Sequence, residues 1–208
     1  MLTPDQFFPF LLAAIVLTAT PGPDNLMVLG MGMAKGRKQG IAFGLGAASG
    51  CLGHTLLAAV GVSALIAASP AAFTVLKVAG GLYLVKLGWG AWRHAGAVNV
   101  AAVGVPAESP ARLFWKGCLA SAINPKVILF FLSFLPQFVV ASRGDAPWQL
   151  AALGATFALQ AAVVFGLIGY FAGAVGQWLS RKPRAGVVLD RVAGTVFIAL
   201  GLKLIVSR

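Results

Sequence analysis

Two short motifs of prolines and polar residues interrupt long apolar stretches of this chain. They are Pro21-Gly22-Pro23-Asp24-Asn25 and Asn124-Pro125-Lys126. Each proline removes a backbone donor and clashes with the preceding helical turn, so a helix has to break or kink there. The sequence therefore predicts helix breaks at Pro21, Gly22, Pro23 and Pro125, each followed by a charged residue in the first turn of a new half-helix.

Asp24 and Lys126 are the charges that follow the two breaks. A proline and an acid at the start of a helix suit its local geometry and its dipole. That does not explain a charge inside a lipid-embedded segment, which costs at least about 2.5–3.5 kcal/mol. Either the two charges form a structural ion pair, or they are the two poles of a site for a zwitterion. In the second case Asp24 faces an ammonium group, while Lys126 or a half-helix N-terminus faces a carboxylate.

Other polar side chains inside apolar stretches are weaker candidates. His54 either lines a cavity or carries a proton, or it forms a hydrogen bond between packed helices. Gln160 either lines a cavity or bonds to a neighbouring helix. The predicted substrate- or proton-binding residues are Asp24, Asn25, Asn124, Lys126, His54 and Gln160.

Metal, cofactor and enzymatic chemistry have little support in the sequence. Cys51 and Cys118 lie in apolar segments, where cysteine packs as a small apolar residue. Cys51 and His54 share a helix face, but two ligands do not make a metal site. No serine lies in a nucleophile elbow, and no nucleophile is paired with a base. We therefore expect no metal, no cofactor and no enzyme activity.

The composition indicates that lipid is the solvent of this chain. Of its 208 residues 59% are hydrophobic and 10% are charged, whereas soluble domains have about 25% charged residues. A spanning helix needs about 20 apolar residues. Six stretches qualify, at about residues 7–33, 41–69, 71–92, 113–141, 148–179 and 187–206. We predict an all-α membrane protein, because lipid offers no partner to exposed backbone groups.

The chain is predicted to be a single membrane domain, residues 1–208, built from two halves. Repeat one covers about residues 1–93, a polar loop covers 94–112, and repeat two covers 113–208. The sequence Lys77-Val78-Ala79-Gly80 in the third stretch resembles Arg191-Val192-Ala193-Gly194 in the sixth. Halves of three spans each would be inverted relative to one another. Broken helices at matching positions of inverted halves indicate the central site of a transporter.

The basic residues gather in alternate connections between the apolar stretches. The net charge is +11, from 16 Lys and Arg against 5 Asp and Glu. The clusters are Lys35, Arg37 and Lys38; Arg93, Arg112 and Lys116; and Arg181, Lys182, Arg184 and Arg191. They form no continuous stripe, so we expect no nucleic-acid partner. The positive-inside rule places these loops in the cytoplasm and both termini in the periplasm, although Lys203 and Arg208 oppose this.

These motifs resemble those of the lysine exporter superfamily, in particular its threonine/homoserine-efflux branch, along essentially the whole chain. The resemblance rests on the following segments: Ala19-Thr20-Pro21-Gly22-Pro23-Asp24-Asn25, His54-Thr55-Leu56-Leu57, Leu76-Lys77-Val78-Ala79-Gly80-Gly81-Leu82-Tyr83-Leu84, Asn124-Pro125-Lys126 and Leu135-Pro136-Gln137-Phe138.

The resemblance implies an efflux carrier in the bacterial inner membrane that exports an amino acid or a close derivative and is driven by protons. It also implies that Asp24 and the two proline motifs are central positions of the transporter. It does not identify the substrate or the oligomeric state, for which a homodimer is one option. We expect Asp24 to bind the substrate ammonium or a proton in competition. The alternative is a carrier of a metal ion or of redox equivalents, which would need paired cysteines or a histidine-rich loop. A membrane enzyme or a purely structural bundle fits less well.

Overall fold

The computed structural model describes residues 2–20, 22–62, 64, 68–93, 95 and 108–206. Within these residues every regular element is helical and no strand occurs, as the all-α prediction requires. The predicted break at Pro21 and most of the predicted loop at residues 94–112 lie outside the described residues.

Both proline motifs break a helix. α1 (Pro4–Ala19) is followed by α2 (Pro23–Lys35) at an angle of 56°. α6 (Pro110–Ala122) is followed at 52° by a second segment, which consists of α7 (Pro125–Leu129), a π-helical turn η2 (Phe130–Phe134) and a 3₁₀ turn η3 (Leu135–Phe138). Pro23 and Pro125 each stand at the first helical position, where proline fits. In the structure the second half-helices thus begin at Pro23, directly after Gly22, and at Pro125.

The described helices include four to six candidate membrane spans by length and composition. Four unbroken stretches are long and apolar enough to cross a membrane: Arg37–Gly61, Ala71–Arg93, Ala146–Tyr170 and Arg184–Val206. The count rises to six if each bent pair is one span. The first stretch comprises α3 (Arg37–Leu57) and a π-helical turn η1 (Ala58–Val62), and the others belong to α5 (Pro70–Arg93), α8 (Ala146–Tyr170) and α10 (Pro183–Val206).

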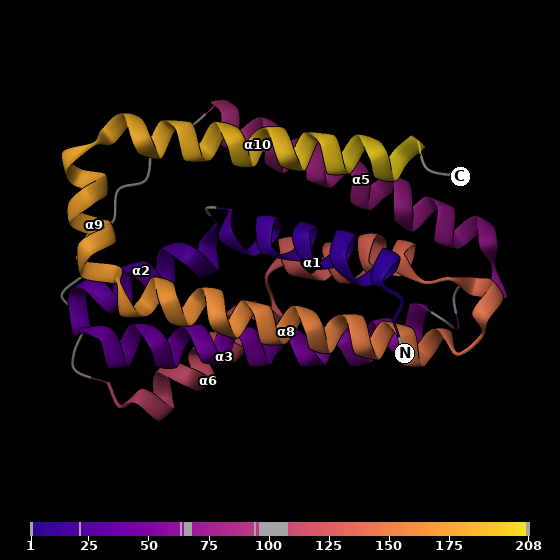
Figure 1. Ribbon diagram of the computed structural model, residues 1–208, viewed down its shortest axis with the longest axis horizontal. Coiled ribbons are helices and arrows are strands. Elements are labelled where there is room, and N and C mark those ends of the chain that lie inside the picture. The colour runs from indigo at the N-terminus through magenta and orange to yellow at the C-terminus, as the bar shows by residue number, and fades with distance from the viewer. Residues whose placement is uncertain are drawn as a thin grey trace.

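The fifth predicted span, residues 148–179, differs from the structure because it contains two helices. α8 ends at Tyr170, Phe171 leaves the helical conformation, and α9 (Ala172–Arg181) begins in a new direction. Figure 1 shows α9 running across the end of the bundle between α8 and α10. The sequence of α9 includes Gln177 and Arg181 among apolar residues. The span therefore ends at Tyr170 because the chain changes direction at Phe171, although apolar residues continue into α9.

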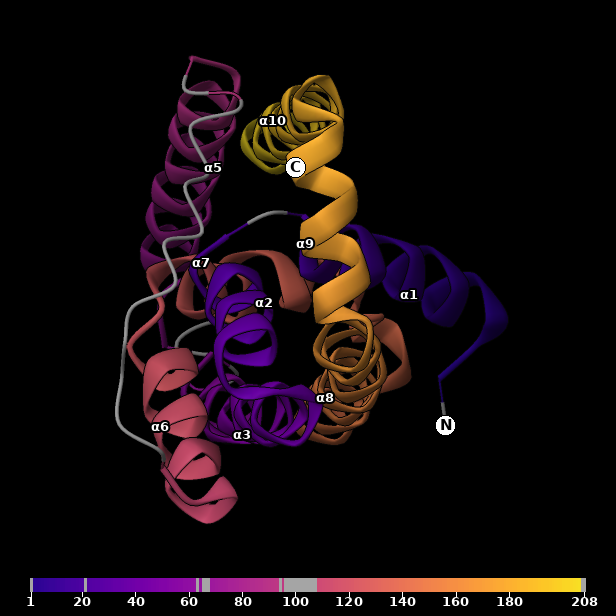
Figure 2. The same cartoon turned by 90° about the vertical axis from the view of Figure 1, so that its left-hand side faces the viewer.

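The long helices form a bundle (Figure 1). α5 and α10 pack against one another, while α3 packs against α6, α8 and α2. Figure 2, which looks at one end of the bundle, shows α2 near the centre with α3 and α8 beside it. α1 begins and α10 ends toward the same end of the bundle, opposite the α2–α3 turn and α9 (Figure 1). The second half-helices of the broken spans, α2 and α7, lie in the interior of the bundle.

Glycines allow α3 and α6 to approach closely. A Cβ at Gly46 of α3 would collide with the backbone of Phe114, and a Cβ at Gly117 of α6 would collide with the backbone of Phe43. Small residues at such crossings are typical of packed membrane helices. The close packing fixes the position of the second break, which follows α6, against the helix that carries His54.

An ionic cluster joins α2 to α6 at the end opposite the termini. The Glu108 carboxylate accepts a hydrogen bond of 3.1 Å from Lys35, at the last turn of α2. It also pairs with Lys116 and, at 3.3 Å, with Arg112. Hydrogen bonds from Lys116 and Lys35 hold the pKa of the Glu108 carboxyl below its usual range. Glu108 belongs to the loop that the sequence predicts to be polar. In the structure its carboxylate connects the two broken spans.

We expect the Glu108→Gln substitution to lower the thermal stability of the detergent-solubilised protein near neutral pH, but not at low pH. A lowered folded-state pKa stabilises the fold above the unfolded pKa of about 4.3, and this contribution is lost as the pH falls through the folded pKa. Melting temperatures of wild type and variant across a pH series measure the effect, with Asp5→Asn as a control. Parallel curves over the whole series would contradict the prediction.

Candidate functional site

The two helix breaks meet inside the bundle through a hydrogen bond between residues 100 positions apart. The side-chain amide of Asn124 donates to the Asp24 carboxylate at 2.8 Å. Both side chains are buried, with 5% of each residue exposed. Asp24 is the second residue of α2, and Asn124 caps α7. The sequence-predicted motifs of the two halves therefore form one site.

Lys126 extends from the start of α7 to the end of α1. Its ammonium donates to the carbonyl oxygens of Leu17 at 3.1 Å and Thr20 at 3.4 Å. The last carbonyls of a helix have no partner within that helix and attract a cation. The ammonium also lies 5.5 Å from the centre of the Phe197 ring. Lys126 thus holds the broken end of α1 against the second half.

Gly22 allows this close approach. A Cβ at position 22 would lie 3.0 Å from the Lys126 ammonium, which is tighter than ordinary packing. Gly22 also caps α2 with extended backbone geometry. The glycine between the two prolines is therefore explained by the lysine of the other motif.

Asp24 and Lys126 do not form a direct ion pair in this structure. Among the described residues, no contact within 4.0 Å joins the Asp24 carboxylate to the Lys126 ammonium. The amide nitrogen of Asn124 donates to Asp24, and its Oδ1 accepts from the Lys126 backbone at 3.0 Å, whereas the Lys126 ammonium binds the carbonyls of α1. Of the two interpretations that the sequence left open, the direct structural pair is absent here. The carboxylate and the ammonium each have their own hydrogen-bond partners, Asn124 for Asp24 and the α1 carbonyls for Lys126.

His54 contacts the second break through Ser121. Its Nε2 lies 3.1 Å from the Ser121 carbonyl oxygen, which also accepts from the Asn124 backbone at 3.0 Å. A carbonyl can only accept, so Nε2 carries the hydrogen in this contact. The imidazole also lies against the Phe131 ring. His54 therefore belongs to the same network as Asp24, to which it is linked through Ser121 and Asn124.

Asn25 and Gln160 meet at Thr18 rather than at Asp24. Asn25 donates to the Thr18 carbonyl at 2.7 Å, and Gln160 donates to the Thr18 hydroxyl at 2.8 Å. Thr18 adjoins Leu17, whose carbonyl binds Lys126. All six sequence-predicted binding residues are buried, at 5–8% exposed. The site therefore has two branches that share the last turn of α1, one charged and one neutral.

A cluster of phenylalanines lies beside the site. Its members, with ring centres 5.0–6.3 Å apart, are Phe10, Phe130, Phe131, Phe134, Phe138 and Phe157. Phe130 makes ring contacts with Phe10 of α1 and Phe157 of α8, and is fully buried. This apolar cluster connects both halves, and it places aromatic surface next to His54 and one helical turn from Gln160.

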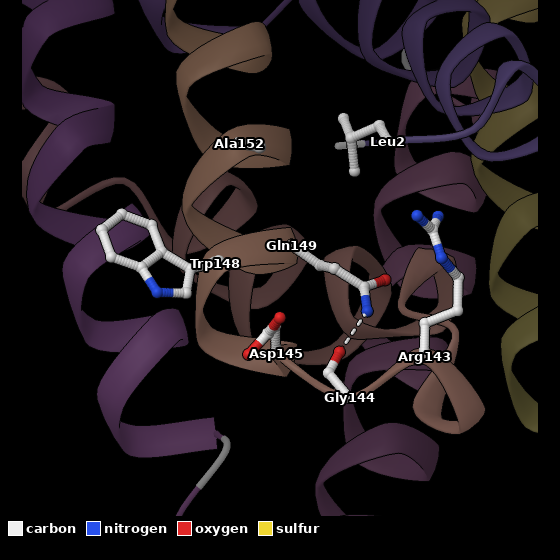
Figure 3. A pocket seen from close by; sticks show the side chains of 7 residues that line it. All are labelled: Leu2, Arg143, Gly144, Asp145, Trp148, Gln149 and Ala152. Carbon is white, nitrogen blue, oxygen red and sulfur yellow. Dashed lines mark hydrogen bonds between the residues drawn. The ribbon is translucent and has the colours of Figure 1, made fainter.

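A cavity of about 310 Å³ lies where the chain begins, away from the breaks. It is lined by Leu2, Arg143, Gly144, Asp145, Trp148, Gln149 and Ala152 (Figure 3), and by none of the sequence-predicted site residues. Figure 3 shows the Gln149 amide bonded to the Gly144 carbonyl, a contact of 2.7 Å. The cavity is thus an opening at the end of the bundle, not the central site.

Sequence reasoning missed several contributors to the site. Thr18 contributes both its hydroxyl and its carbonyl, and Ser121 links His54 to the break. The carbonyls of Leu17 and Thr20 bind the lysine. The polar pair Thr18 and Thr20 just before the first break was the available signal. It does not distinguish the threonine that reaches the site from the one that bonds within its own helix.

Cys51 and Cys118 are free thiols in the structure. Cys51 lies 3.6 Å from the Ser121 hydroxyl and bonds to the carbonyl four residues before it. In the part of the chain that the structure describes, no group of three or more metal-ligating side chains gathers. The thiols have the surroundings of packing residues.

An apolar helical bundle with two interrupted spans and a buried polar site where the interruptions meet has the architecture of a membrane transporter, not of an enzyme. The chain belongs to the LysE type translocator family, whose model matches residues 15–208. The resemblance predicted from the motifs is therefore confirmed, and the protein is a membrane efflux translocator.

Characterised relatives are similar along nearly the whole chain. A homoserine/homoserine lactone efflux protein of Salmonella typhimurium is 28% identical over 100% of this chain and 99% of its own. A threonine efflux protein of Escherichia coli K12 is 30% identical over 97% and 98%. A leucine efflux protein of Enterobacter is 28% identical over 96% and 94%. Among solved structures, none matches significantly.

Proposed function

We propose that this protein exports an amino acid or a close derivative across the bacterial inner membrane in exchange for protons. The observation that carries the proposal is the buried Asp24 carboxylate, bonded to Asn124 where the two broken spans meet. A charge retained inside a membrane bundle marks a functional site by default. The names of the relatives, which include efflux proteins for homoserine, threonine and leucine, support an amino-acid substrate.

In this proposal Asp24 binds either the substrate ammonium or a proton. Because one carboxylate serves both, substrate arriving from the cytoplasm displaces the proton, and protons from outside favour release. Lys126 or the N-terminus of a half-helix receives the substrate carboxylate. Asn124 suits this exchange, because its amide donates to the charged carboxylate and its own carbonyl is held by the Lys126 backbone.

The transport movement that we propose is a rocking of two inverted halves around the central site. α1 begins and α10 ends toward the same end of the bundle (Figure 1), as expected for an even number of spans. The basic turn after α2 and the ionic cluster of Glu108 lie at the opposite end, which we assign to the cytoplasm by the positive-inside rule. Both termini are then periplasmic. In this proposal the Lys35–Glu108 contact has to break before substrate can enter from the cytoplasm.

The alternative of a metal or redox carrier has no observation in its favour. It would require Cys51 and Cys118, which are free thiols, one buried and one half-buried. A variant with both cysteines replaced by Ala should retain export under the amino-acid proposal. Loss of transport in that variant, with normal insertion, would favour the alternative.

The proposal is tested by measuring amino-acid efflux from loaded cells that produce the protein, compared with cells without it, across a panel of substrates. We expect faster efflux for a subset of amino acids. We also expect efflux to stop when an ionophore collapses the pH gradient. Efflux that continues without the gradient would refute the exchange for protons but not the export of amino acids. Equal efflux from both cell types would refute amino-acid export.

A further inference from the structure

The neutral branch of the site has hydrogen-bonding capacity that the protein does not use. Thr18 of α1, Asn25 of α2 and Gln160 of α8 are each more than nine-tenths buried. The amide nitrogens of Asn25 and Gln160 both donate to Thr18. The amide oxygens of both residues, Asn25 Oδ1 and Gln160 Oε1, have no hydrogen-bond partner among the described residues. Two buried acceptors without a partner therefore belong to amides that are both bonded to the same threonine.

Thr18 also differs from four other threonines that lie within or at the end of helices. Hydroxyls in the helices commonly donate to the carbonyl four residues earlier, as they do at Thr20, Thr55, Thr156 and Thr195. The Thr18 hydroxyl accepts from Gln160, and within α1 no such bond to Ala14 is formed. Its own hydrogen therefore remains able to donate.

Unused capacity of this kind is not general in the bundle. Two further buried glutamines, Gln6 and Gln149, bond to each other at 2.8 Å. Gln149 also donates to the Val140 and Gly144 carbonyls and accepts from the Val140 backbone. Buried polar groups in folded proteins are normally satisfied in this way, and exceptions call for an explanation such as a ligand. The Thr18 cluster is such an exception.

We propose that Thr18, Asn25 and Gln160 bind the side-chain hydroxyl of the exported amino acid, and that this selects hydroxylated substrates; the inference rests on the proposed function. A hydroxyl both donates and accepts, so it matches an amide oxygen and the Thr18 hydrogen together. An ammonium group cannot accept from Thr18, and none of the three residues carries a charge to neutralise it. Asp24, on the charged branch next to this cluster, has that charge.

The test compares export of threonine and valine, which differ by a hydroxyl in place of a methyl group. We expect wild type to export threonine about 10- to 100-fold faster than valine, because a site that bonds a hydroxyl discriminates against an analogue lacking it. Gln160→Met removes one acceptor at similar size. It should lower threonine export more than valine export, so that the ratio of the two rates falls toward one.

Thr18→Val is the second variant and should have the same selective effect. The matched controls are Gln177→Met in α9 and Thr156→Val in α8, whose hydroxyl bonds within its own helix. Both should keep the preference for threonine. If Gln160→Met impairs folding, binding to the purified Thr18→Val variant, followed as thermal stabilisation by threonine or valine, replaces the transport measurement.

Three results would overturn the inference. They are export of threonine and valine at equal rates by wild type, an equal loss of both substrates in the variants, and retention of the preference in both variants. An equal loss would mean that the cluster binds the part common to all amino acids. If wild type exports no amino acid at all, the proposed function fails instead, so the two failures are distinguishable.

Discussion

Replacing Asp24 by Asn is expected to reduce amino-acid export by roughly 100-fold or more, because the lost interactions with an ammonium group or a proton are charge-assisted. Asparagine keeps the size of the side chain and can still bond to Asn124, whose amide lies 2.8 Å from Asp24 in wild type. It cannot carry the negative charge or bind a proton. The variant should therefore insert and fold normally while failing to exchange substrate for protons.

The measurement is efflux from loaded cells at matched amounts of protein in the membrane. Asp5→Asn is the matched control, because Asp5 is an exposed carboxylate in the first turn of α1, outside the site. It should export at the wild-type rate. Unimpaired export by Asp24→Asn would remove Asp24 from the site and with it the proposed proton exchange.

Replacing Lys126 by Met is expected to abolish export but to lower the free energy of unfolding only modestly. The carbonyls of Leu17 and Thr20 lose a charged donor, and each such bond contributes about 1.5–3 kcal/mol. Removing a buried lysine from a membrane bundle relieves about 2.5–3.5 kcal/mol. The two effects largely offset one another, so the net loss should be about 0–3 kcal/mol. The end of α1 would lose its contact with the second half, and the site would lose its positive pole.

Efflux and melting temperature in detergent check this prediction together. Lys86→Met, at an exposed position of α5, is the control for loss of a lysine. Export by Lys126→Met at the wild-type rate would show that the lysine is dispensable and would leave the substrate carboxylate to the half-helix N-terminus. A collapse of folding with no inserted protein would show that capping of α1 outweighs the relief from burying a charge.

Local properties of the chain were sufficient to predict the helical class and the presence of several helices apolar enough to span a membrane. The length of an apolar run and the missing donor of a proline act within one segment, so α2 and α7 begin at Pro23 and Pro125 as expected. The candidate residues followed from the cost of placing polar groups among apolar ones. The end of the fifth span at Tyr170 was not predicted, because apolar residues continue into α9.

Only the tertiary structure decided which groups meet. The sequence left open a direct pair between Asp24 and Lys126, yet Asp24 binds the Asn124 amide and the lysine binds the carbonyls of α1. Thr18 and Thr20 are alike in sequence, but only Thr18 receives Gln160, from 142 positions away. Such contacts depend on the crossing of helices and on side-chain direction. These properties are set by how several helices pack together and by no single segment.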